Sequence, residues 1–379
     1  MKKIAIIGAS LFQAPLITKA KELGYETHVF AWKANDVGES LADFFYPISI
    51  KEKEQILEKC LEIGVDAVCS IGSDVATITV NYIGNKLGIN CNSEDCSRFS
   101  TNKHLMRQAF EENGVPSPRS ILVNDISDLD NIEYDFPLIV KPTDRSGSRG
   151  INKVYDKEQL ARAIEKAKAE SFENKALVEE FVEGQEYSVE CISYHGEHHL
   201  LAITKKYTTG APHFVEHGHF EPAPEVNFTR EGIEAVVFRA LDALQIHDGA
   251  SHSELKVNDD GSIKLIEVGA RMGGDFIGSH LVELSTGVDF VKNVIDVAFD
   301  NPPDITVTKH NASAVLFIFD DSDLEKYKKV RSEHPEYIIL ENVDDLIDGE
   351  LFDSTDRKGY FVFGGEDREY VYSLLGPEN

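Results

Sequence analysis

Short apolar runs that end in glycine or alanine alternate with helical patterns over the first hundred residues. Ile4 to Gly8, Thr27 to Ala31 and Val65 to Gly72 are such runs, and Lys51 to Glu62 has a helical pattern. Continuous apolar runs bounded by turns are typical of buried parallel strands. Their alternation with helices predicts a small doubly wound parallel sheet at the N-terminus.

After residue 100 the strands become more frequent and suit an antiparallel sheet. Helices are expected over Asn102–Glu112, Lys153–Lys168 and Thr229–Leu244, and strands over Asp135–Pro142, Ala176–Val182, Tyr187–Tyr194 and His199–Lys205. A further apolar strand is expected over Ala312–Phe319, with short strands near Tyr360–Val371. The sequence therefore predicts an α/β fold followed by a small C-terminal α+β piece.

Composition excludes several classes of protein. The formal net charge of -28 argues against a nucleic-acid groove or an anionic membrane surface, since both need clustered Lys and Arg. The five cysteines include no C-x-x-C, so neither a disulfide framework nor a zinc clamp is indicated. No signal peptide or membrane span is apparent, and a cytoplasmic protein is expected, with a homodimer as the commonest assembly of soluble enzymes.

The first glycine turn, Gly8 to Gln13, is only a partial match to a dinucleotide-binding fingerprint. It lacks the second and third glycines of G-x-G-x-x-G, which let the backbone approach a pyrophosphate. A scaffold role is favoured over a nicotinamide site, although a ligand at this position stays open.

Two acidic residues in the middle of the chain are candidates for binding a metal ion. Glu254 and Glu267 lie on short apolar strands separated by Asn258 to Gly261, a strong hairpin-turn signal. The hairpin predicts that the two carboxylates lie side by side, with Arg271 just beyond. Paired carboxylates repel unless a cation lies between them, and Mg²⁺ prefers oxygen ligands together with substrate phosphates. The alternative is a solvated hairpin with two exposed glutamates.

Cations and a small-residue loop are candidates for contacting phosphates. Lys141 ends an apolar strand and is followed at once by the loop Ser146-Gly147-Ser148-Arg149-Gly150, whose N–H groups could fold over phosphate oxygens. Lys103 lies at an expected helix start, where the helix dipole does not favour a cation unless it meets an anion. A plain turn and a surface lysine are the competing interpretations.

An acidic strand end follows and is a candidate for binding a nucleoside. Glu179, Glu180, Phe181 and Val182 end one strand, and their backbone groups could contact an adenine edge, while Glu186 could accept hydrogen bonds from both ribose hydroxyls.

The order of these elements resembles the ATP-grasp superfamily, in the branch of carbamoyl phosphate synthetase and biotin carboxylase. The resemblance implies an N-terminal Rossmann-like domain over 1–99, a two-lobed ATP-grasp domain over 100–309 and a small C-terminal domain over 310–379. The lid lobe would cover about 115–185, and the metal and substrate lobe about 186–309.

The resemblance also implies roles for the residues above. Lys103 and Lys141 would contact phosphates and Ser146 to Gly150 would form a lid, with Glu179 to Val182 and Glu186 at the nucleoside. Glu254 and Glu267 would ligate two Mg²⁺ ions, for which Mn²⁺ could substitute, and Arg271 would stabilise the reacting carboxyl group. Gly269 stands where the family usually has Asn, which leaves the coordination of the second ion open.

A segment around Val215 to Pro224, with Gly273 and Gly274, resembles the amino-acid ligases of the bacilysin type. His217 and His219 would then line a substrate loop, and His252 would point into the same site. Metal binding by His217 and His219 and a loop without a direct role are the alternatives.

The resemblance implies an ATP-dependent carboxylate–amine ligase that acts through an acyl phosphate on small molecules, with amino acids as the favoured acid. Three alternatives stay open: a purine-pathway ligase or carboxylase of the same fold, a catalytically silent ATP-binding module, and an oxidoreductase that uses the N-terminal sheet.

Overall fold

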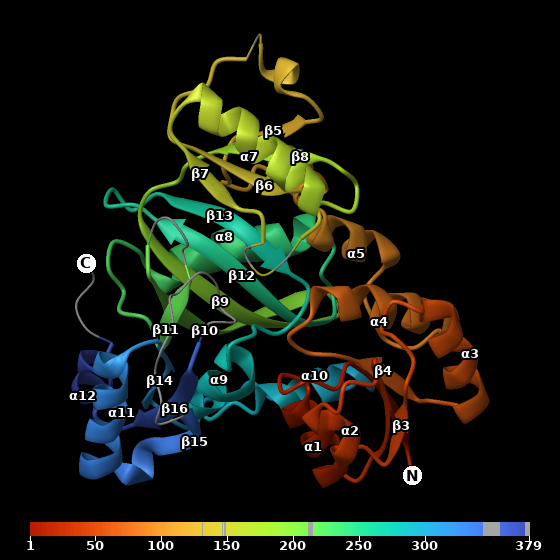
Figure 1. Ribbon diagram of the computed structural model, residues 1–379. Coiled ribbons are helices and arrows are strands. Elements are labelled where there is room, and N and C mark those ends of the chain that lie inside the picture. The colour runs from red at the N-terminus through yellow and green to blue at the C-terminus, as the bar shows by residue number, and fades with distance from the viewer. Residues whose placement is uncertain (131, 146, 148, 211–214, 344–356, 376–379) are drawn as a thin grey trace.

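Three β-sheets organise the part of the chain described by the computed structural model, which covers residues 1–130, 132–145, 147, 149–210, 215–343 and 357–375 (Figure 1). One sheet belongs to the N-terminal region, one forms a separate lobe at the top of Figure 1, and the largest lies between them and the C-terminal helices. The predicted α/β fold, with a small parallel sheet at the N-terminus, is confirmed.

The N-terminal sheet is parallel and has the strand order β3-β2-β1-β4. Its strands are β1 (Lys3–Ile7), β2 (Glu26–Phe30), β3 (Phe44–Tyr46) and β4 (Ala67–Cys69). Its helices are α1 (Ala14–Glu22), α2 (Val37–Leu41), α3 (Lys53–Ile63) and α4 (Asp74–Leu87). Helix α3 ends where Gly64 adopts a left-handed conformation, the usual helix C-terminus.

The lid sheet is antiparallel and has the order β5-β8-β6-β7, with one helix packed against it. Its elements are β5 (Ser120–Val123), β6 (Leu138–Pro142), β7 (Asn152–Val154), α7 (Lys157–Glu170) and β8 (Ala176–Glu180). The helix expected from Lys153 begins instead at Lys157, because Lys153 pairs with Ile139 in the sheet and the Asp156 side chain caps the helix.

Within the described residues, the large sheet has eight strands in the order β13-β12-β9-β10-β11-β14-β16-β15. They are β9 (Gln185–Tyr194), β10 (Glu197–Thr208), β11 (Glu216–Glu221), β12 (Gly249–Val257), β13 (Ile263–Gly269), β14 (Ala312–Ile318), β15 (Ile338–Val343) and β16 (Gly359–Gly365). Strands after residue 310 therefore continue the sheet of the middle region, which ties the C-terminal piece to it.

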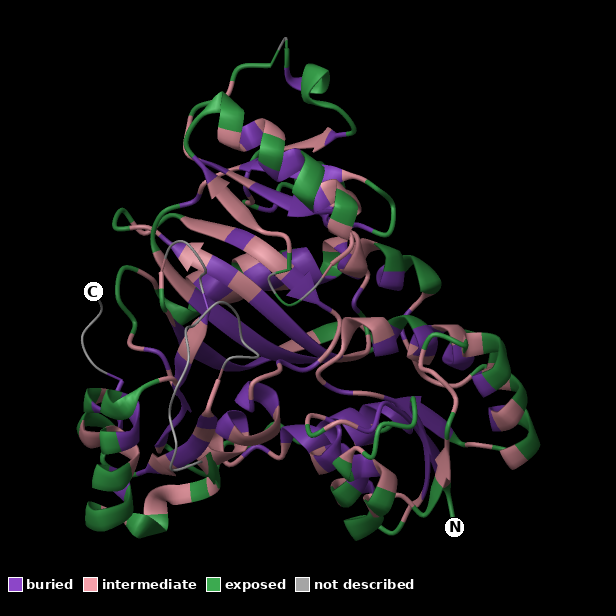
Figure 2. Ribbon diagram, viewed as in Figure 1, coloured by how far each residue is buried: buried purple, intermediate pink, exposed green. Residues whose placement is uncertain are grey.

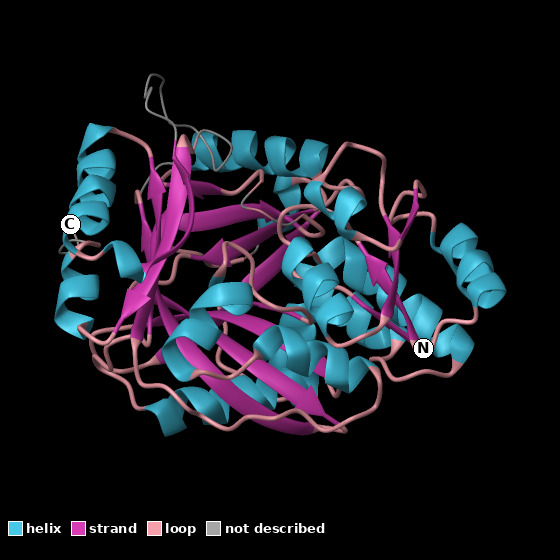
Figure 3. Ribbon diagram, turned by 90° about the horizontal axis from the view of Figure 1, so that it is seen from below, coloured by secondary structure: helices cyan, strands magenta, loops and turns pink. Residues whose placement is uncertain are grey.

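The remaining helices surround the large sheet, as Figure 3 shows from below. They are α5 (Glu94–Thr101), α6 (Lys103–Glu112), α8 (Arg230–Ala243), α9 (Val282–Thr286), α10 (Phe290–Ala298), α11 (Asp321–Glu333) and α12 (Arg368–Ser373). The short strands expected as far as Val371 were wrong beyond β16, because the Asp367 side chain accepts a hydrogen bond from the Tyr370 N–H and begins α12. No helix in the described ranges combines the length and apolarity needed to cross a bilayer.

The large sheet is buried through most of its strands, while the outer faces of the surrounding helices are exposed (Figure 2). Alternation along β9 places Tyr187, Val189 and Cys191 in an apolar core with helices α6 and α8. Glu186, Ser188 and Glu190 alternate with them and so lie on the opposite face, where the polar side chains described next converge.

Candidate active site

The two acidic residues of the central hairpin face each other as expected. Glu254 on β12 is the register partner of Glu267 on β13, and the turn between the strands is closed by the Gly261 N–H donating to the Asn258 carbonyl at 2.9 Å. Both carboxylates are partly exposed, at 28% and 29%. The predicted juxtaposition is confirmed.

Each of these carboxylates has a buried lysine as its partner. Lys206 Nζ on β10 lies 2.7 Å from Glu254 Oε1, and Lys103 Nζ at the start of α6 lies 2.7 Å from Glu267 Oε1. Burial raises the pKa of Glu254, but the charges and hydrogen bonds of Lys206 and His252 together hold this pKa well below its ordinary value. Burial lowers the pKa of Lys206, yet three surrounding carboxylates raise it well above its ordinary value. The site is therefore an anionic pair already balanced by cations.

Lys141 is held by a second buried network at the junction of the two lobes. Its Nζ lies 2.6 Å from Glu179 Oε2, and Arg107 Nε donates to Glu179 Oε1 at 2.7 Å. Burial lowers the pKa of Lys141 and raises that of Glu179, but the two cations hold Glu179 below its ordinary value. Arg107 Nη2 also donates to the Ile266 carbonyl, beside Glu267. The Glu179 carboxylate is thus engaged in orienting Lys141.

The strand end proposed for the nucleoside lies between lysines of both lobes. The Phe181 ring lies 3.3 Å from Lys153 Nζ of the lid and 5.2 Å from Lys256 Nζ of β12. Glu180 pairs with Lys264, and Val182 is buried. Glu186, for its part, lies 3.0 Å from Lys206 Nζ.

The small-residue loop after Lys141 is only partly described. Gly147 and Gly150 have left-handed φ angles of 70° and 74°, which other residues rarely adopt. Ser146 and Ser148 lie outside the described residues. The Arg145 carbonyl accepts a 2.7 Å hydrogen bond from Lys103 Nζ, which ties the start of the loop to the carboxylate pair.

His252 points to the same face as Glu254, as its spacing predicted. Its Nδ1 bonds Glu190 and its Nε2 lies 3.5 Å from Glu254 Oε1. Glu190 also accepts from the Gly273 N–H at 2.9 Å. A Cβ at Gly273 would lie 2.5 Å from Glu190 Oε1, so a side chain there would displace the Glu190 carboxylate, whereas Gly274 borders open space.

The segment expected to be a substrate loop is a strand for most of its length, because Glu216–Glu221 pairs with both β10 and β14. His217 Nε2 contacts Asp323 at 2.8 Å. His219 is buried, and its nearest acidic atom is Asp275 Oδ2 at 3.7 Å, longer than a hydrogen bond. Burial lowers the pKa of His219. Within the described ranges, no three His, Cys, Asp or Glu side chains are arranged to hold a metal ion.

The C-terminal region contributes a cation to the surroundings of His219 and Asp275. Arg357, just before β16, holds Asp275 with both terminal nitrogens, at 3.0 and 2.8 Å, and its guanidinium lies 3.5 Å from the Phe317 ring centroid. Burial raises the pKa of Asp275, but the nearby His219 and the Arg357 guanidinium that bonds it hold this pKa far below its ordinary value.

Arg271 has a partner from the N-terminal region that the sequence did not suggest. Its Nε lies 2.9 Å from Asp74 Oδ1, at the start of α4. Asp74, Arg107, Glu190, Lys206 and Arg357 were missed, because each joins the site through tertiary packing rather than a local motif. Lys153 was missed as well, although it had a local signal as a lysine in a strand next to the loop that ends at Gly150, because it was assigned to a helix.

The first glycine turn is closed by its own side chain. Gln13 Oε1 accepts from the Ser10 N–H and hydroxyl, and Gln13 Nε2 donates to the Ile71 carbonyl at 2.6 Å. A Cβ at Gly8 would lie 2.9 Å from the Gln13 amide. The scaffold interpretation of this turn is therefore supported by its own hydrogen bonds.

Comparisons with known proteins relate part of this chain to a known family. Residues 134–279 match the family model described as "ATP-grasp domain". The chain is 26% identical to the alanine–anticapsin ligase of Bacillus subtilis (strain 168) over 301 residues, which are 70% of this chain and 63% of that protein. It thus spans less than two thirds of that relative's length.

Solved structures extend the likeness to the whole fold. The L-amino acid ligase from Bacillus licheniformis superposes with a TM-score of 0.81 at 23% identity, over 99% of this chain and 97% of that one. The phosphoribosylglycinamide synthetase from Anaerococcus prevotii superposes with a TM-score of 0.76 at 20% identity, over 99% and 96%. At these identities the likeness describes the fold alone.

Proposed function

Because residues 134–279 belong to the ATP-grasp family, we propose that this chain is an ATP-dependent carboxylate–amine ligase that acts on amino acids. The observation that supports it most directly is the pairing of Glu254 with Glu267 in register, each held by a buried lysine at the junction of two lobes. The division of the chain at residues 99 and 309 stays a prediction.

The donor set fits Mg²⁺ together with a nucleotide. Two partly exposed carboxylates are too few for a metal site built by the protein alone, but Mg²⁺ typically takes one or two carboxylates and fills its remaining positions with phosphate oxygens and water. Lys206 and Lys103 show that positive charge is already favoured beside both carboxylates. We propose Glu254 and Glu267 as the ligands; bound there, Mg²⁺ would neutralise phosphate charge.

The lysines between the lobes are suited to a triphosphate. Lys103, Lys141 and Lys153 come from a helix start, a lid strand and the neighbouring lid strand, so a ligand between the lobes would meet all three. Lys141 is oriented by Glu179 rather than left mobile, which lowers the cost of ordering it around a phosphate. Gly147 and Gly150 would bring backbone N–H groups near the same oxygens.

At the other end of the nucleotide, the proposal places the nucleoside against Phe181. The backbone of Glu180 and Val182 would contact adenine, and Glu186 would accept bonds from ribose hydroxyls.

The chemistry joins an acid to an amine in two displacements. A substrate carboxylate oxygen attacks the γ-phosphorus of ATP, and the bond to ADP breaks to leave an acyl phosphate. The amine nitrogen then attacks the acyl carbon, the C–N bond forms, and phosphate leaves as the nitrogen loses a proton. Arg271 would stabilise the negative charge on the acyl oxygen through its planar fork. His219, His252 and the backbone at Gly273 and Gly274 would line the substrate side of this centre.

A screen of amino-acid pairs with Mg-ATP tests the proposal by the ADP released. Release should require both an acid and an amine, and a new amide product should accompany it. Glu254→Gln should reduce release by about three orders of magnitude, because one ligand charge is lost. Asp259→Asn, in the exposed turn of the same hairpin, is the matched control and should leave release unchanged.

Two outcomes would redirect the proposal. ADP release that needs a phosphoribosyl amine or bicarbonate instead of an amino acid would favour the purine-pathway alternative. Tight Mg-ATP binding without ADP release under any pairing would favour a silent module.

A further inference from the structure

A bidentate ion pair joins the N-terminal region to the end of β13. Asp74 Oδ1 lies 2.9 Å from Arg271 Nε and Asp74 Oδ2 lies 3.4 Å from Nη2. The two side chains are 17% and 19% exposed. Arg271 Nη1 donates to the Met272 carbonyl at 3.3 Å. A guanidinium has five N–H donors, so these three bonds leave donors free for a substrate oxygen while fixing the plane of the fork.

The same ion pair occupies the space beside Gly269. A Cβ built at Gly269 would lie 3.0 Å from Asp74 Oδ1 and 3.2 Å from Arg271 Nε. These contacts are tighter than ordinary van der Waals distances, so a side chain at 269 and the ion pair as it stands would compete for one space. The Asp74–Arg271 ion pair therefore keeps its present geometry only while residue 269 has no side chain.

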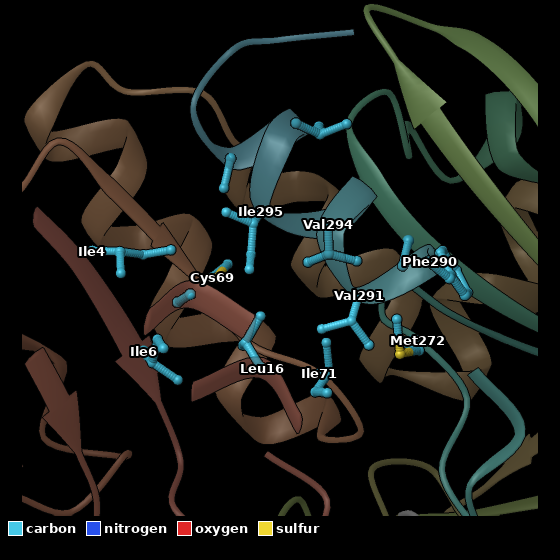
Figure 4. Close-up of a cluster of buried hydrophobic side chains, with 14 of the residues drawn as sticks. Ile4, Ile6, Leu16, Cys69, Ile71, Met272, Phe290, Val291, Val294 and Ile295 are labelled. Carbon is cyan, nitrogen blue, oxygen red and sulfur yellow. The ribbon is translucent and has the colours of Figure 1, made fainter. Parts of the chain in front are cut away.

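Rigid apolar packing brings Asp74 to this place. A buried cluster connects β1, α1 and the end of β4 with α10, and it includes Ile71 and Met272, which are close in sequence to Asp74 and Arg271 (Figure 4). Asp74 also lies in the first turn of α4, where Ser73 caps the helix and the dipole favours an acid. The carboxylate is thus held by a packed interface and not by a mobile loop.

We propose that Asp74 is a positioning residue for Arg271 and that its carboxylate takes the place of the side chain that Gly269 lacks. The inference rests on the proposed function, since it assigns Arg271 the developing charge on the acyl group. By this inference the N-terminal region is part of the reacting site. Loss of the Asp74 carboxylate would free the Arg271 guanidinium to move, so the turnover rate would fall. Nucleotide binding would not change, because it uses other residues.

Three variants of the full chain test this: Asp74→Asn, Gly269→Ala and the double variant. Asp74→Asn keeps the shape of the side chain and removes the charge, so kcat should fall about 10- to 100-fold while the KM for ATP changes less than about twofold. Gly269→Ala should lower kcat about tenfold by displacing the pair. Because both act on one contact, the double variant should be no more than about threefold below Asp74→Asn.

The matched control is Asp95→Asn, which removes an aspartate from an exposed pair with Arg98 at 2.8 Å. Surface pairs contribute little, so its kcat and melting temperature should be unchanged. Asp74→Asn with a lowered melting temperature but normal kcat would show a merely structural role and overturn the inference. Multiplicative kcat losses in the double variant would also overturn it.

A stability measurement separates this inference from the proposed function. The free energy of unfolding of the same variants should show coupling between positions 74 and 269, whether or not the chain is a ligase. Additive losses there would overturn the shared-space argument. If the unmutated chain releases no ADP with any acid and amine, the proposed function fails, and this coupling still decides whether Asp74 replaces a side chain at 269.

Discussion

The turn after β1 and the end of the β12–β13 hairpin both contain small residues beside polar groups, yet they differ in what surrounds them. In the first turn, the Gln13 side chain bonds Ser10 within the turn and the Ile71 carbonyl that follows β4. The hairpin end draws Lys103, Lys206 and Asp74 from three other elements and leaves its two carboxylates partly exposed. A turn tied by neutral hydrogen bonds to the neighbouring segments suits a scaffold, whereas a strand end where charges from distant elements converge suits a ligand.

The largest expected effect comes from removing charge at the hairpin end. Glu267→Gln should abolish ligation to below about one thousandth, since the carboxylate proposed to hold Mg²⁺ disappears and Lys103 loses its partner. Amine-dependent ADP release measures it, with thermal unfolding as the check that the variant is folded. Activity within tenfold of the unmutated chain would place the metal elsewhere.

Arg271→Lys should have the next largest effect, a loss of about 10- to 100-fold in kcat. A lysine ammonium is a point charge and cannot bond Asp74 through two nitrogens while facing an oxyanion. Steady-state kinetics with saturating ATP measures the loss. A normal kcat would show that the planar fork is not used in the reaction.

A smaller effect is expected on β11, which the proposed function places on the substrate side of the site. His219→Ala should change the preference among amino acids by about tenfold and leave the KM for ATP unaltered, because His219 lies on β11 beside Asp275 and not on the lid strands that carry Lys141 and Lys153. Relative kcat/KM for a panel of amino acids decides it. An unchanged panel would remove β11 from the substrate site.

How much of this site was predictable depended on sequence separation. The Glu254–Glu267 pair was predictable because a short turn fixes the register of two strands. The ion pairs of the site were not predictable in the same way. Lys103 and Glu267 lie 164 residues apart in the sequence, and Asp74 and Arg271 lie 197 apart. Local periodicity fixes which face a side chain takes but not which distant element packs there.

The fold likewise was predictable where neighbouring elements pack together and not where distant strands pair. The parallel N-terminal sheet followed from alternating strands and helices, which bury apolar runs in one common way. The joining of β14 to β11 did not, because a pairing between strands far apart in sequence leaves no local signal. The C-terminal piece was therefore expected to stand apart, whereas its strands extend the large sheet.

A modest effect on stability is expected from a carboxyl group on the face of the sheet that holds the site. Burial raises the pKa of Glu221 to about 8, against bonds from Ser285 and Thr204 hydroxyls. Between pH 4.5, the ordinary value, and about 8, the unfolded chain loses this proton and the folded chain keeps it. Stability from this group is therefore full below pH 4.5 and is lost as pH rises toward 8.

Glu221→Gln removes that proton exchange and tests the assignment. Its melting temperature relative to the unmutated chain should rise by several degrees between pH 5 and pH 8, because only the unmutated chain is destabilised over that window. Thermal unfolding at both pH values measures it. A difference that stays constant with pH would show that Glu221 is ionised in the folded protein.

The smallest effect should come from the turn after β1, and it completes the comparison. Gln13→Ala removes the side-chain bonds to Ser10 and to the Ile71 carbonyl, which should cost about 1–2 kcal/mol in the free energy of unfolding. ADP release and the KM for ATP should stay within about twofold, because the hydrogen bonds that the Gln13 side chain makes within the described residues go to Ser10 and Ile71 of the N-terminal region. A loss of ADP release as large as that of Glu267→Gln would mean that the turn after β1 and the end of the β12–β13 hairpin serve one ligand. The contrast between a scaffold and a site would then not hold.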